Sequence, residues 1–130
     1  MKKVLLGVLT AISLVQFLPA KEVPPETYES IRIRAARMGE TDAGKAYEKR
    51  FSEVFAKPMQ AALLECTKET KTPYTVNLVF VIDASGKAKY VVAASDQPVS
   101  MCVAKKLEGM QLPAPSTEGQ LVEVSITIEH

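Results

Sequence analysis

Apolar residues recur at steps of three and four through much of the first half of the chain, the spacing of a helix that buries one face. The strongest run predicts a helix of about six turns, and Asp42 can cap its start. Pro58 lies inside this run, but the spacing continues in phase past it, so we expect one kinked helix. A weaker run over residues 26–38, ended by Gly39, predicts a helix before it. The long run consists of Tyr47, Phe51, Val54, Phe55, Met59, Ala62, Leu63 and Cys66.

After residue 72 the spacing changes to the alternation that is typical of strands. Residues 74–82 are apolar on both faces, which favours a central strand. A turn at 83–86, where Gly86 supplies a positive φ, leads to a second strand over 87–94. Residues 120–129 predict a half-buried last strand. On the second strand, Ala88, Tyr90 and Val92 are expected to share one face. The expected inward side chains of the last strand are Val122, Val124, Ile126 and Ile128.

A third helix fits between the second and last strands, with Asp96 as its cap, Pro98 in its first turn and Gly109 at its end. The fold class is then α+β, with N-terminal helices over 26–67 and a β-β-α-β unit over 73–129. The hairpin makes the first two strands antiparallel, and a right-handed crossover places the last strand on the other side of the first. We therefore expect a three-stranded antiparallel or mixed sheet in the order 2-1-3, with helices over one face.

The N-terminus has the pattern of a secretory signal peptide. Lys2 and Lys3 precede an apolar stretch over residues 4–18, and Ala20 provides a small residue at a cleavable bond. The stretch is shorter than the roughly 20 residues of a bilayer span, which favours cleavage over the alternative of an uncleaved anchor. We expect a signal peptide over 1–20, a single domain over 21–130 and a periplasmic or secreted location, with no membrane span after cleavage.

The two cysteines, Cys66 and Cys102, are most simply one disulfide in an oxidising compartment. The alternative is two buried free thiols. Their spacing is not C-x-x-C, so a redox-active dithiol is not expected.

Charge and residue types argue against several functions. The net charge is +1, and loss of Lys2 and Lys3 with the signal peptide makes it negative, so no basic surface for nucleic acid is expected. His130 is the single histidine and lies at the chain end, where a catalytic pair or metal site is difficult to build. Asp83 and Asp96 fit a turn and a helix cap. We therefore expect no catalytic, metal-binding or cofactor-binding residues, and no enzyme activity.

The second half of the chain resembles a known family. The segment over 74–88, with alternating apolar residues, an Asp-x-x-Gly turn and a lysine, is similar to the first hairpin of TonB C-terminal domains. The resemblance continues through 91–95, the third helix and the final strand over 122–128. The cysteine pair and the Leu-Pro-x-Pro stretch at 112–115 are similar to gliding-motility and secreted relatives. Thr72-Pro73-Tyr74 and Met110-Gln111-Leu112 depart from the family, which commonly has Tyr-Pro and an aromatic residue there.

The resemblance implies a non-enzymatic module that binds a protein or peptide of the cell envelope. An extended peptide could add to a sheet edge; the alternative is a small secreted inhibitor or immunity protein that blocks an envelope enzyme or toxin. Charge favours the second strand as the docking edge, because Tyr90, Val91 and Val92 are uncharged whereas the last strand carries glutamates. Ile33, among the arginines of the first helix, is a second candidate contact, although those arginines also fit a solvated face.

Overall fold

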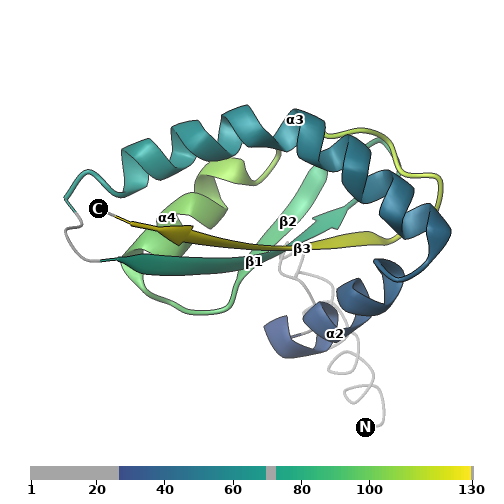
Figure 1. Cartoon of the computed structure of the whole chain (residues 1–130), viewed down its shortest axis with the longest axis horizontal. Helices are drawn as coiled ribbons and strands as arrows, with labels where there is room; N and C mark the ends of the chain where they lie inside the picture. Colours follow the sequence, from purple (N-terminus) through teal and green to yellow (C-terminus); the bar gives the residue numbers. More distant parts are fainter. Residues whose placement is uncertain (1–26, 70–72, 130) are drawn as a thin grey trace, which may run out of the picture.

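The computed structural model describes residues 27–69 and 73–129, and the predicted signal peptide lies outside them. The residues described here form an α+β fold with three helices and a three-stranded sheet, as the sequence predicted (Figure 1). No helix in these two ranges is long and apolar enough to cross a membrane. The elements are α2 (Tyr28–Met38), α3 (Asp42–Cys66), β1 (Tyr74–Ile82), β2 (Ala88–Ala93), α4 (Pro98–Leu107) and β3 (Gln120–Ile128).

Local capping explains where the two N-terminal helices begin and end. The Thr41 hydroxyl oxygen accepts the N–H of Gly44 at 2.9 Å, so Thr41 caps α3 and the predicted cap, Asp42, is its first residue. Gly39 ends α2 as expected, and its N–H donates to the carbonyl of Ala35. The prediction of a single long helix is confirmed, because α3 continues through Pro58.

The sheet order β2-β1-β3 is confirmed, and both neighbours of β1 run antiparallel to it. Leu78 illustrates the register, since it lies opposite Ala93 on one side and Val124 on the other. Burial explains the central position of β1, because Leu78, Val79 and Phe80 are all completely buried. A strand that is apolar on both faces is stable only where both faces are covered.

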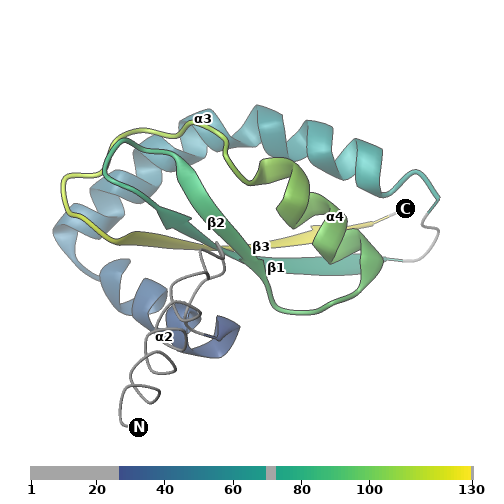
Figure 2. The same ribbon diagram turned by 180° about the vertical axis from the view of Figure 1, so that it is seen from behind.

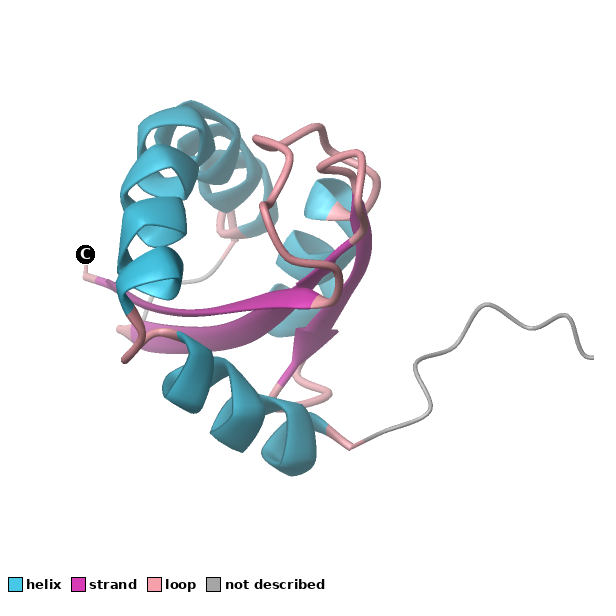
Figure 3. Cartoon of the chain, turned by 90° about the vertical axis from the view of Figure 1, so that its right-hand side faces the viewer, coloured by secondary structure: helices cyan, strands magenta, loops and turns pink. Residues whose placement is uncertain are grey.

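The helices lie on both faces of the sheet, which corrects the expectation that they cover one. Helices α3 and α4 pack over the face that carries Leu78 and Phe80. Helix α2 lies on the opposite face (Figure 3). There its Ile31 packs with Val79 and Leu121. The reason is hydrophobic: Val79 and Leu121 point away from α3, and α2 removes their apolar surface from water.

A β-bulge in β2 corrects the expected facing of that strand. Val81 lies opposite Tyr90 and Ile82 opposite Ala88, so Lys89 is an extra residue. Ala88 faces the α3 side. Beyond the bulge the phase reverses, so that Val91 faces the same side while Val92 packs toward α2, and Tyr90 shares its face.

Helix α4 begins with Pro98 in its first position, as predicted, but its cap is Gln97 rather than Asp96. The Ser95 hydroxyl oxygen accepts the N–H of Gln97 at 3.1 Å and shapes the approach to the helix. Figure 2 shows α4 beside β2, with the chain then returning over the top of the sheet to β3. This return includes Gly109, whose φ of 89° is readily adopted only by glycine.

Candidate interaction edges

The outer edge of β2 exposes backbone groups of alternate residues. Ala94 donates its N–H to the carbonyl of Asn77 at 3.0 Å, so Ala94 and, by alternation, Val92 direct their backbone groups toward β1. The backbone groups of Val91 and Ala93 must then point outward. Within residues 27–69 and 73–129, no strand pairs with them from outside.

The beginning of the same edge is already covered by the segment that follows α4. The N–H of Ala88 donates to Met110 at 2.9 Å, and the carbonyl of Ala88 accepts the N–H of Gly109 at 2.8 Å. The carbonyl of Gly86 accepts the N–H of Leu112 at 2.8 Å. The edge of β2 that is open to another chain is therefore shorter than the strand itself.

The structure brings three of the four predicted contact residues to this edge. Val91 is 7% exposed and turned toward α4, whereas Tyr90 and Val92 are half-buried on the α2 side. Ile33 is separate from them. Ile31 and Ala35 of α2 are buried, so Ile33 lies on the outer side of that helix, where it is 41% exposed.

The outer edge of β3 is longer. Asn77 uses its backbone groups toward β2, so its partner Ser125 must direct its own groups away from β1. By alternation the same holds for Leu121, Glu123 and Thr127. Among the described residues, no strand lies beyond β3.

A hollow of about 250 Å³ separates this edge from α3. Its apolar wall includes the half-buried ring of Phe55, which stacks on Phe51 with centroids 4.8 Å apart and meets Phe80 edge-on at 5.4 Å. The sequence placed Phe55 in the core stripe and missed this exposed part. Phe55 is four residues from both Phe51 and Met59, in the middle of the stripe, so the pattern gave no indication of it. The remaining lining residues are Glu48, Ser52, Val122, Glu123 and Val124.

Charge is concentrated near the same edge. Burial, and secondarily the carboxylate of Glu123, raises the pKa of Tyr28. Arg32 forms an ion pair with Glu29 one turn earlier on α2. These groups lie on the α2 side of the sheet. The side of β3 toward α3 is mainly apolar, although Glu48 of α3 also lines the hollow there.

Asp83 stabilises the hairpin turn, as the sequence suggested. Its carboxylate accepts the Ser85 hydroxyl at 2.7 Å and the N–H of Lys87 at 3.0 Å, and these hydrogen bonds lower its pKa. Gly86 has the expected positive φ, at 96°. In residues 27–69 and 73–129, no group of three or more histidine, cysteine or acidic side chains is placed to hold a metal ion.

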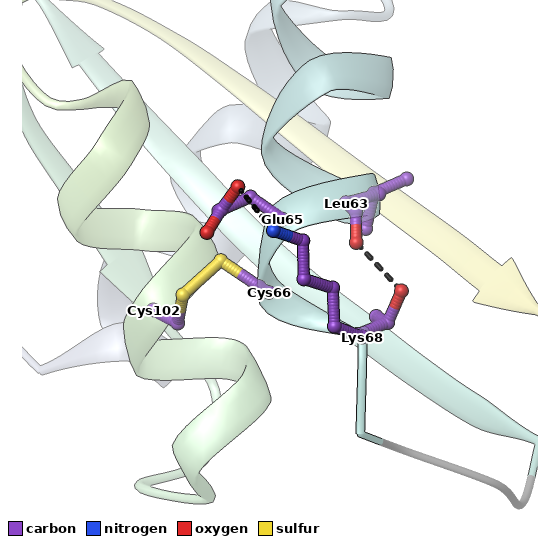
Figure 4. The surroundings of a disulfide bond; sticks show 6 residues. Leu63, Glu65, Cys66, Lys68 and Cys102 are labelled. Atoms are coloured by element: carbon purple, nitrogen blue, oxygen red, sulfur yellow. Dashed lines mark hydrogen bonds and ion pairs between the residues drawn. A yellow bond between two sulfur atoms is a disulfide. The ribbon is translucent and has the colours of Figure 1, made fainter.

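The predicted disulfide is present. Cys66 and Cys102 are bonded, with their Cα atoms 5.8 Å apart, and both are half-buried. Figure 4 shows the bond between the last turn of α3 and α4, beside the ion pair of Lys68 and Glu65 at 3.3 Å. The bond fixes the position of α4, which packs over β2, relative to α3.

The sequence and the structure were both compared with known proteins. No family model, curated protein or solved structure was found to match the chain.

Proposed function

We propose that this protein is an exported, non-enzymatic module of the TonB C-terminal type that binds an extended peptide along a sheet edge. The observation that carries the proposal is the outer edge of β3, where open backbone groups run beside an apolar hollow under α3. An added strand would gain main-chain hydrogen bonds from the edge and side-chain contacts from the hollow. The disulfide is consistent with export to an oxidising compartment.

The structure favours β3 over β2 for this role. The sequence favoured β2 because it lacks acidic residues, but the chain after α4 already occupies the start of that edge. The outward backbone groups of β3 extend from Leu121 to Thr127. A peptide could therefore pair over a longer distance on β3, and backbone pairing is the main source of affinity in this mode of binding.

The two sides of β3 also predict the peptide that binds. Side chains of an added strand alternate between faces, so every second one would meet the hollow with Phe55 and Val124, and the others would meet the side with Glu123. We expect an extended peptide with apolar residues at alternate positions and at least one basic residue between them. Glu123 then contributes to recognition rather than only protecting the edge.

A peptide library displayed on phage, enriched on the purified exported protein, would test the proposal. Binding of the enriched peptide would be measured by fluorescence anisotropy against variants Ser125→Pro and Ser125→Ala. Proline removes an outward N–H from the edge without breaking the pairing to β1, so affinity should fall at least tenfold, whereas alanine should leave it unchanged.

Phe55→Ala tests the hollow separately and should weaken peptides with a large apolar residue more than those with alanine at that position. Circular dichroism would establish that each variant is folded. Equal affinity of the proline and alanine variants for every enriched peptide would exclude the β3 edge.

A further inference from the structure

The uncovered part of β2 is self-complementary. Its residues Tyr90, Val91, Val92 and Ala93, and Ala94 directly after them, carry no charge, and the larger ones precede the smaller ones. If a second copy of the strand runs antiparallel with Val92 opposite its own equivalent, Val91 lies opposite Ala93 and Tyr90 opposite Ala94. Large side chains then meet small ones on both sides of the central Val92 pair.

The backbone favours the same register. Val91 and Ala93 are the residues whose N–H and carbonyl groups point outward. Pairing Val91 with the Ala93 of a second copy uses both residues of both strands, which gives roughly four hydrogen bonds. If one copy of the strand moved by two residues in either direction, the pairing would have to include the bulge at Lys89 or residues beyond the end of the strand.

The surface beside β2 adds a second complementary feature. A hollow of about 300 Å³ lies between α4 and β2, and Met101, at its rim, is 51% exposed. Lys105 and Glu108 also line this hollow and carry opposite charges. A two-fold axis brings two antiparallel copies of α4 to the same side of the joined sheets, where each Lys105 can meet the Glu108 of the other copy.

We propose that two copies of this chain associate through β2 in a two-fold dimer whose axis passes at Val92. The two sheets join into one of six strands, and the side chain of Met101 is covered. Both β3 edges remain at the outer margins. This dimer does not depend on peptide binding, because it uses the opposite edge of the sheet. The interface is short, so the association is weak and reversible.

Cross-linking tests the position of the axis. Directly opposed residues of a non-hydrogen-bonded pair have Cα atoms about 4.5 Å apart, within the roughly 4.4–6.8 Å that a disulfide spans. Purified exported Val92→Cys should therefore form an interchain disulfide on mild oxidation, with the Cys66–Cys102 bond intact by peptide mapping. Ser125→Cys, on the outer edge of β3, is the matched control and should remain largely monomeric.

Sedimentation velocity over roughly 10 µM to 1 mM protein tests the affinity. Val92→Lys places like charges opposite one another and should raise the dimer dissociation constant at least tenfold, whereas Ser125→Lys should not. Lys105→Glu alone should also weaken the dimer, because it places two acidic residues opposite one another. The double variant Lys105→Glu, Glu108→Lys should restore the affinity. A protein that is monomeric over the whole range would overturn the proposal, as would equal cross-linking through Val92→Cys and Ser125→Cys.

Discussion

Removal of the disulfide should have a large and calculable effect on stability. The two cysteines are 36 residues apart in sequence, so the bond closes a loop of that size in the unfolded chain. In the chain-entropy model, a loop of this length corresponds to about 4 kcal/mol at 25 °C. For a domain of about 100 residues, each kcal/mol shifts the thermal midpoint by roughly 4–8 °C. The variant with Cys66→Ala and Cys102→Ala should therefore melt at least about 15 °C below the wild type.

Urea unfolding, followed by circular dichroism, would measure the free energy directly. The single variants Cys66→Ala and Cys102→Ala should be as unstable as the double variant, because each of them opens the loop. Titration of the wild type with a thiol reagent in denaturant, without reductant, should find no free thiol. A difference of less than about 1 kcal/mol between the variants and the oxidised, correctly bonded wild type would contradict this prediction, since the bond would then constrain little in the unfolded chain.

Four further predictions concern Gly86, Gly109, Tyr47 and the N-terminus. Gly86→Ala should cost about 2–4 kcal/mol of unfolding free energy by urea titration, because φ is positive and the new Cβ would lie 2.3 Å from a backbone oxygen. Gly109→Ala, where φ is also positive but the space is open, should cost about 1 kcal/mol. Burial raises the pKa of Tyr47 to about 12, and its hydroxyl donates to Pro113 at 2.8 Å. The folded state therefore holds this proton more tightly than the unfolded state, so stability should fall as the pH rises from 10 toward 12. Tyr47→Phe should reduce that decrease and leave the part that Tyr28 contributes, because burial raises the pKa of Tyr28 as well. Mass spectrometry of the exported protein should find an N-terminus at Lys21, and an intact Met1 would contradict cleavage.

The sequence was most informative where burial alone decides the structure. The limits of β1 were predicted to the residue, because a strand between two neighbours and two covered faces requires apolar side chains on both sides. The disulfide and the long helix through Pro58 were predictable for similar reasons, since compartment and periodicity each point to one outcome.

Features that depend on long-range backbone contacts were not predictable. The bulge at Lys89 changes no residue type, so alternation placed Tyr90 and Val92 on the wrong face. The pairing of Ala88 with the chain after α4 involves only backbone groups and has no counterpart in the side-chain pattern. Leu121, an apolar residue on the outward face of the last strand, together with Val79 and Val81 of β1, was an indication that this face is also covered.

The disulfide also determines how the molecule would respond to mechanical load. A pulling force applied at the two ends passes along α3 to Cys66, crosses the bond to Cys102 and continues through α4 to β3. The hairpin of β1 and β2 lies outside this path, in a covalent loop that the force cannot extend. On the order of 120 Å of chain is withheld from stretching in this way. Reduction of one bond would release that length in a single step.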